Sequence, residues 1–149
     1  MLATGWFALS QMADLNRSLE AMVDTRTTVV AGRQARRGRS LVCVDLGGGQ
    51  GGLAVPLARL GHHVTVIDPS LDALASLSRR AGDSGVAERI LAVQGDSATL
   101  LDVHPDADAD LVCCHGVLEF VDDPGATLRS VAAVLSTGGY SCPVAATRI

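Results

Sequence analysis

Short apolar runs alternate with longer segments of mixed character from residue 41 onward. Short apolar runs between glycine or polar residues are typical of buried strands, and apolar residues three and four apart predict helices. We predict strands at Leu41–Leu46, Val64–Ile67, Ile90–Val93, Leu111–Cys114 and Tyr140–Ala146. We predict helices at Leu53–Leu60, from Pro69–Ser70 to about Ala81, and at Pro124–Ser136, with Gly138–Gly139 ending the last helix.

Strands that alternate with helices predict an α/β fold built from right-handed βαβ units. We expect a doubly wound, mainly parallel sheet of about five strands, with Pro143 tolerated only in an edge strand. Such a sheet binds ligands at the carboxyl ends of its strands. The expected site therefore comprises Asp45–Gly52, Asp68, Gly95–Ser97 and His115–Glu119.

The residues before this pattern form a separate N-terminal region. Apolar residues at helical spacing predict a helix at Leu9–Val23, which a run of arginines follows. The run is either a solvated linker or a phosphate-binding patch. It contains Arg26, Arg33, Arg36, Arg37 and Arg39, with no acid among them. We divide the chain into residues 1–40, an N-terminal helix and Arg-rich linker, and residues 41–149, the ligand-binding domain.

Composition excludes several classes of protein. The 149 residues fit one domain. Apolar residues make up 48% of the chain and charged residues 19%, which argues against disorder. No apolar run approaches the length of about 20 residues that a membrane helix needs, and Met1–Ala13 has no basic leader. The net charge of −4 argues against binding nucleic acid with the whole surface. We expect a cytoplasmic protein that does not enter a membrane.

The four cysteines all lie in predicted strands, and they form no Cys-x-x-Cys pair. Adjacent Cys113 and Cys114 are expected to point to opposite faces of one strand, while Cys43 and Cys142 stand alone. Buried reduced thiols are the expected state, and neither a disulfide framework nor a metal site is predicted.

The segment between the first strand and the first helix, Gly47–Gly52, consists of glycines apart from Gln50. Glycines let the backbone turn sharply and approach a ligand, and the helix N-terminus favours an anion. Gly47, Gly49 and Gly52 also satisfy GxGxxG, which does not separate a dinucleotide site from other adenosine sites. A tight structural turn is the alternative interpretation.

Two acidic residues accompany this loop. Asp68 ends the second strand about 20 residues after Gly47, a position that suits a carboxylate accepting from ribose hydroxyls. Capping the next helix is its alternative role. Asp45 lies inside the first strand, where dinucleotide folds usually have an apolar residue. It either orients the glycine loop or binds an ammonium group, or is a structural carboxylate satisfied by loop N–H groups.

Polar residues also end the third and fourth strands. Asp96, with Ser97 beside it, is placed to accept from an adenine amino group, or to cap the following helix. His115 ends the fourth strand as a ligand contact, a general base or a hydrogen-bonded structural histidine. Because it has no neighbouring metal ligands, it does not predict a zinc site.

Together these motifs resemble the class I S-adenosylmethionine-dependent methyltransferases. The likeness rests on Val44–Gly51, Val66–Asp68, Gln94–Asp96 and Leu128–Gly139. It runs from about Leu41 to Tyr140 and implies a Rossmann-like sheet. The triple glycine, the segment His115–Pro124 and the following helix resemble more narrowly the tRNA 5-carboxymethoxyuridine methyltransferase group.

The resemblance implies S-adenosylmethionine as the cofactor. Gly47, Gly48 and Gly49 would hold its methionine end, Asp68 its ribose, and Asp96 and Ser97 its adenine. In the narrower group a histidine matching His115 and an arginine before the first strand, for which Arg26 is the candidate, also contact the cofactor. The acceptor would be a small molecule or tRNA, and no catalytic base is assigned.

The chain also departs from the family. A complete sheet of this family has seven strands, whereas Ile149 follows the fifth directly, so we expect a C-terminally truncated domain lacking the last two strands. A dimer or a partner would then cover the exposed edge. One alternative is an adenosyl-ligand-binding module without activity. An NAD-dependent oxidoreductase is a further alternative, disfavoured by Asp45 and by the absence of any lysine for a Tyr-x-x-x-Lys pair.

Overall fold

The computed structural model describes residues 31, 32, 34 and 37–144, so the predicted helix at Leu9–Val23 and Arg26 lie outside the described residues. The strands are β1 (Val42–Leu46), β2 (His63–Asp68), β3 (Ile90–Gln94), β4 (Ala109–His115) and β5 (Leu135–Val144). The helices are α2 (Ala54–Arg59), α3 (Leu71–Asp83), α4 (Thr99–Val103) and α5 (Pro124–Val134), with a 3₁₀ turn η1 (Ala87–Arg89). None of these described helices is long and apolar enough to span a membrane.

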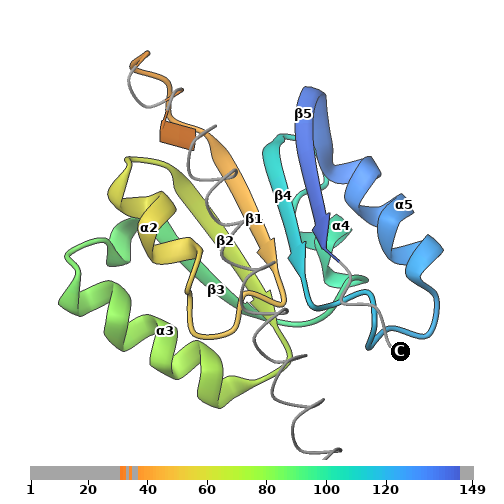
Figure 1. The fold of residues 1–149 in the computed structure, drawn as a ribbon, viewed down its shortest axis with the longest axis horizontal. Coiled ribbons are helices and arrows are strands. Elements are labelled where there is room, and N and C mark those ends of the chain that lie inside the picture. The colour runs from red at the N-terminus through yellow and green to blue at the C-terminus, as the bar shows by residue number, and fades with distance from the viewer. Residues whose placement is uncertain (1–30, 33, 35–36, 145–149) are drawn as a thin grey trace, which may run out of the picture.

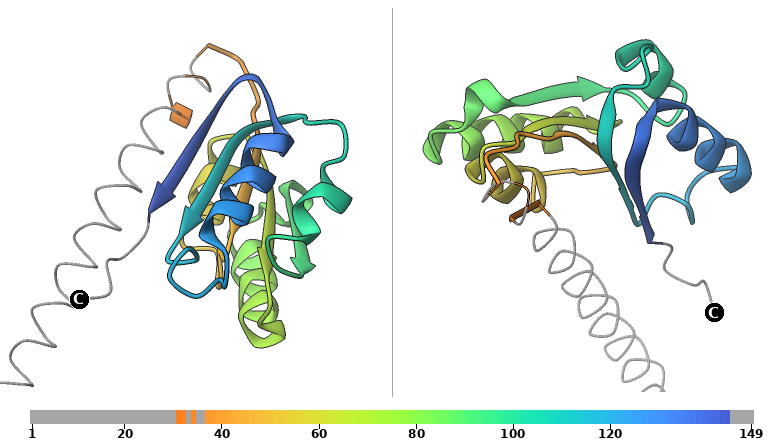
Figure 2. Two further views of the ribbon diagram at one scale, coloured as in Figure 1. Left: turned by 90° about the vertical axis from the view of Figure 1, so that its right-hand side faces the viewer. Right: turned by 90° about the horizontal axis from the view of Figure 1, so that it is seen from above.

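The strands form one parallel sheet in the order β3-β2-β1-β4-β5 (Figure 1). Strand order reverses at β1, which pairs with β2 on one side and with β4 on the other. Helices cover both faces of the sheet, with α5 beside β4 and β5 (Figure 2). The predicted α/β, doubly wound fold is confirmed, and the reversal point is where such sheets bind ligands.

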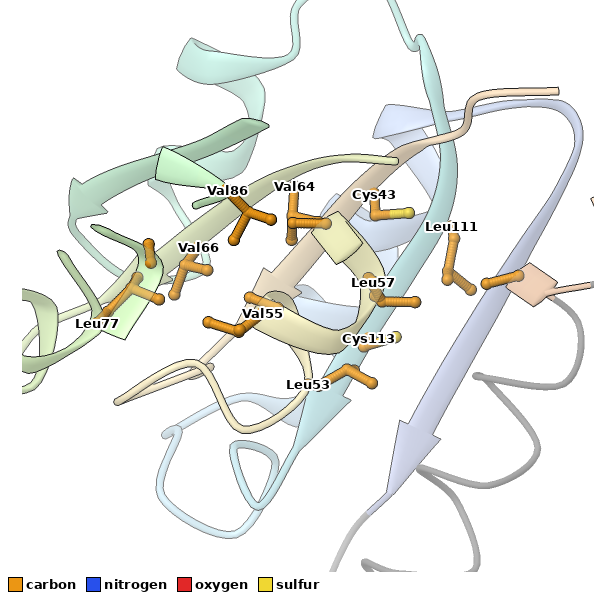
Figure 3. Packing of buried hydrophobic residues seen from close by; sticks show 14 of the residues in the cluster. Cys43, Leu53, Val55, Leu57, Val64, Val66, Leu77, Val86, Leu111 and Cys113 are labelled. Carbon is orange, nitrogen blue, oxygen red and sulfur yellow. The ribbon is translucent and has the colours of Figure 1, made fainter. Parts of the chain in front are cut away.

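Side chains along the central strands point alternately to the two faces of the sheet, so the hydrophobic core forms two clusters. On one face, side chains of α2 and α3 pack against alternate residues of β1, β2 and β4 (Figure 3). On the other face, α4 and α5 cover the remaining alternate residues, including Val44 and Leu46 of β1. Cys113 belongs to the first cluster and Cys114 to the second, as predicted from the period of two.

The prediction for the last helix and strand was wrong in its boundaries. Helix α5 ends at Val134, and β5 begins at Leu135, before Gly138–Gly139. Ala109 pairs with Leu135, whereas Leu111 pairs with Tyr140, so extra residues of β5 bulge out between these pairs. Because the bulge absorbs both glycines, they interrupt strand pairing and do not stop the helix. The sheet order places β5, which contains Pro143, at an edge.

Two short elements between β2 and β4 were not given bounds by the sequence pattern, although a helix after Asp96 was implied by its possible capping role. Helix α4 spans only Thr99–Val103, with Leu100 buried and Leu101 exposed. The 3₁₀ turn Ala87–Arg89 buries none of its residues. A segment this short does not repeat an apolar period, so the pattern of apolar positions carries no signal for it.

Residues before β1 are tied to the sheet by polar contacts. Arg39 pairs with Asp110 at 2.8 Å, and Asp110 also accepts the Val42 N–H at 3.0 Å. His62, fully buried, accepts the Leu41 N–H at Nδ1 and donates from Nε2 to the Ala31 carbonyl, at 3.1 and 3.0 Å. Arg39 therefore anchors the start of β1, which neither interpretation of the arginine run included.

The buried thiol of Cys43 is expected to be unreactive in the folded protein. Burial, with the Asp110 and Asp45 carboxylates adding to it, raises the pKa of Cys43 to about 12. Because the thiolate is the nucleophile, iodoacetamide at pH 8.5 should label folded Cys43 at least about 100-fold more slowly than the urea-unfolded chain. Peptide mass spectrometry measures the two rates. Similar rates would show that the thiol is accessible and ionised.

Candidate functional site

A cleft of about 350 Å³ opens at the carboxyl ends of β1, β2, β3 and β4. Four chain segments that are distant in sequence line it, as the strand-end rule predicts. The lining residues are Leu46, Gly47, Ile67, Asp68, Pro69, Gly95, Asp96, Ser97, Gly116, Val117, Phe120 and Val121. The residues of the expected site that line this cleft are Leu46, Gly47, Asp68, Gly95, Asp96, Ser97, Gly116 and Val117.

The glycine loop is a hydrogen-bonded turn against the end of β2. The Gly47 N–H donates to the Ile67 carbonyl at 2.7 Å, and the Gly51 N–H donates to the Gly48 carbonyl at 2.9 Å. Gly51 has a positive φ, which only glycine adopts at low cost. The loop is thus a hydrogen-bonded turn, a geometry that both the structural-turn and the ligand-binding interpretations allow.

Asp68 joins this loop to the start of α3. Its Oδ2 accepts the Gly49 N–H at 2.9 Å, and its Oδ1 accepts the Ser70 N–H at 2.8 Å. The residue that caps α3 is Ser70, whose hydroxyl accepts the Ala73 N–H. A carboxylate has about four acceptor positions, so these two bonds leave capacity for ligand hydroxyls at the cleft.

Asp45 lies beneath the loop, outside the cleft lining. Only 2% of its surface is exposed, and a Cβ added to Gly48 would collide with its carboxylate. Gly48 is therefore required for close packing of the loop on Asp45. Of the roles predicted for Asp45, loop orientation matches this position, and the binding of an ammonium group stays a prediction.

The turn between β3 and α4 also lines the cleft. Asp96 is exposed, and its Oδ1 accepts the Ala98 N–H at 2.8 Å, so it holds the turn that precedes α4. Ser97 faces the cleft, and its hydroxyl accepts a hydrogen bond from Thr127 Oγ1 at 3.2 Å. Thr127 is a buried residue of α5, so α5 holds this turn in place through the bond to Ser97.

An apolar wall after β4 also lines the cleft, and of its residues the expected site included only Val117. It consists of Val117, Phe120 and Val121, where the Phe120 N–H donates to the Val117 carbonyl at 2.9 Å. Phe120 is 76% exposed at the mouth of the cleft. The signal that could have found this wall is the position of the apolar residues directly after a strand that ends at the ligand edge.

Two predicted cofactor contacts, the side chains of His115 and Arg26, lie outside the described part of the structure. His115 is the last residue of β4, and only its backbone is described, beside Val144 of β5. Arg26 lies outside the described residues. Among the residues that the structure describes, no group of three His, Cys, Asp or Glu side chains is arranged to hold a metal.

Comparison with known proteins shows the family to which this chain belongs. Residues 44–142 match the family described as "Methyltransferase domain". The chain is 31% identical over 101 residues to a tRNA 5-carboxymethoxyuridine methyltransferase of Escherichia coli, covering 68% of this chain and 38% of that protein. It is 34% identical over 125 residues to a ubiquinone biosynthesis O-methyltransferase of Xanthomonas campestris, covering 83% and 49%.

A solved structure shares both sequence and fold with the chain. It is an S-adenosylmethionine-dependent methyltransferase from Geobacter sulfurreducens in complex with S-adenosyl-L-homocysteine. The identity is 27% and the TM-score 0.61, over 78% of this chain and 46% of that one. The chain thus spans about half the length, or less, of these three relatives.

Proposed function

Because this chain belongs to the class I S-adenosylmethionine-dependent methyltransferases, we propose that it binds S-adenosylmethionine in the cleft and transfers a methyl group from it. The observation that carries the proposal is Asp68, a buried carboxylate that bonds the glycine loop and lines the cleft. A ribose offers two neighbouring hydroxyls, which suit an anchored carboxylate with acceptor capacity left. The residues at the cleft therefore fit an adenosyl ligand.

The other parts of the cofactor are assigned to the remaining residues of the site. Gly47, Gly48 and Gly49 would hold the methionine end, with Asp45 fixing the loop from below. Asp96 and Ser97 would border the adenine. His115 would border the methyl-bearing end, and Arg26 would also contact the cofactor, as the resemblance implies.

Chemistry at such a site needs positioning more than side-chain catalysis. When bound, S-adenosylmethionine supplies a methyl group on a sulfonium, an electrophile that needs no further activation. An acceptor nucleophile would form a bond to the methyl carbon while the carbon–sulfur bond breaks and its electrons stay on sulfur. The chain's contribution is to hold the two reactants in line, and we assign no catalytic base.

The acceptor would enter beside the apolar wall of Val117, Phe120 and Val121, which reaches the cleft mouth. We propose a small molecule or a tRNA nucleotide as acceptor, the two classes that the names of the relatives suggest. We also propose a cytoplasmic protein in which residues 1–40 are an extension of the domain at residues 41–149. A second copy or a partner would cover the edge strand β5.

Thermal unfolding with S-adenosylhomocysteine tests the proposal. At about 100 times its Kd the ligand adds about 2.7 kcal/mol, which should raise Tm by about 5 °C or more. NAD at the same concentration should leave Tm unchanged. A rise with NAD alone would support an oxidoreductase, and a rise with neither ligand would contradict the proposed cofactor. Binding without transfer to any offered acceptor would favour an adenosyl-ligand-binding module.

A further inference from the structure

We propose that Arg80 is a positioning residue that holds the glycine loop in the shape required by the amino-acid end of the cofactor. This inference rests on the proposed function. Arg80 lies in the second half of α3, outside the cleft lining, and would act through the backbone of the loop.

Helix α3 meets the glycine loop at two consecutive residues. The Arg80 guanidinium donates from Nη1 to the Gln50 carbonyl at 2.8 Å. Leu77, three residues earlier and therefore on the same face of the helix, lies against the next residue of the loop. A Cβ added to Gly51 would collide with the Leu77 Cδ1, and Leu77 itself is fully buried (Figure 3).

These contacts fix one peptide plane at both ends. The Gln50 carbonyl is held by Arg80, and the N–H of the same peptide, on Gly51, donates to the Gly48 carbonyl at 2.9 Å. Because a peptide is planar, the carbonyl and the N–H turn together. At the preceding residue, Asp68 of β2 accepts the Gly49 N–H. Arg80 and Asp68 thus hold the loop from two elements, and only Asp68 also lines the cleft.

The neighbouring Arg79 provides a matched control. It carries the same charge on the same helix, but its guanidinium donates to Ser76 Oγ of α3 at 2.9 Å. Its removal takes away one positive charge from the same helix without releasing the Gln50 carbonyl. A difference between the two positions therefore reports the contact with the loop and not the net charge.

Isothermal calorimetry on Arg80→Ala, Arg80→Lys and Arg79→Ala tests the inference with two ligands. S-adenosylhomocysteine carries the amino-acid end, whereas 5′-methylthioadenosine lacks it. Arg80→Ala should weaken the binding of S-adenosylhomocysteine about 5- to 10-fold, which is less than a buried charged hydrogen bond contributes because Arg80 is exposed to solvent. The same substitution should weaken the binding of 5′-methylthioadenosine less than twofold. Arg80→Lys should recover most of the loss, and Arg79→Ala should change neither affinity by more than twofold.

The outcomes separate this inference from the proposed function. If the unsubstituted chain does not bind S-adenosylhomocysteine, the proposed function fails, and this inference fails with it. If that chain binds and Arg80→Ala loses equal affinity for both ligands, or no more than Arg79→Ala loses, only the role of Arg80 is overturned. Thermal unfolding without ligand should give a Tm for Arg80→Ala within about 2 °C of that for Arg79→Ala.

Discussion

Asp68→Ala is expected to weaken S-adenosylhomocysteine binding at least about 100-fold, or about 2.7 kcal/mol. The carboxylate contributes in two ways, because it would accept from the ribose and because it already accepts the Gly49 and Ser70 N–H groups. Hydrogen bonds to a charged acceptor are worth about 1.5–3 kcal/mol each, so losing the ribose contact and the loop anchor together accounts for this factor. Calorimetry measures the affinity directly.

Two further variants separate the ligand contact from folding. Asp72→Ala removes an acid from the exposed first turn of α3 and should leave the affinity within about twofold. Asp68→Asn keeps the shape but turns one acceptor oxygen into a donor group, which must then face a backbone N–H. It should bind nearly as weakly as Asp68→Ala. Affinity for S-adenosylhomocysteine that survives in both Asp68 variants would remove Asp68 from the proposed ribose contact.

The fold was largely predictable because its core is periodic. The apolar residues of β1 and β4 are buried on both faces of the sheet. Their continuous apolar sequence differs clearly from the three- and four-residue spacing of the helices between them. Glycine and proline marked the boundaries of α2 and α3 to within two residues. Parallel strands place their carboxyl ends at one edge, so the meeting of Gly47, Asp68 and Ser97 also followed from the order of elements.

What could not be predicted depends on contacts between segments distant in sequence. The bond from Thr127 to Ser97 joins α5 to the cleft wall, and no spacing in the sequence indicates it. The contact of Arg80 with the Gln50 carbonyl is of the same kind. The bulge in β5 arises because β4 and β5 pair around two glycines, whereas local propensity alone favours a stop there. Local patterns thus gave the positions of the strand ends, and tertiary contacts shaped the loops.

Gly51→Ala is expected to lower the free energy of unfolding by about 2–5 kcal/mol, as the sum of a backbone cost and a packing cost. Gly51 has a positive φ in the left-handed region. That conformation costs an alanine about 1–2 kcal/mol. The new methyl group would also collide with Leu77, which is fully buried in the core under the loop. Such overpacking costs about 1–3 kcal/mol. Urea unfolding followed by circular dichroism measures the loss.

Gly52→Ala is the matched control, one residue further along the same loop. Gly52 does not have a positive φ, and a Cβ added there meets no atom within 4 Å. Alanine at a compatible position restricts the unfolded chain, so stability should stay level or rise by about 0.4–1 kcal/mol. If Gly51→Ala proved as stable as Gly52→Ala, the loop would not be packed against α3 as the structure shows, and the role inferred for Arg80 would lose its geometric basis.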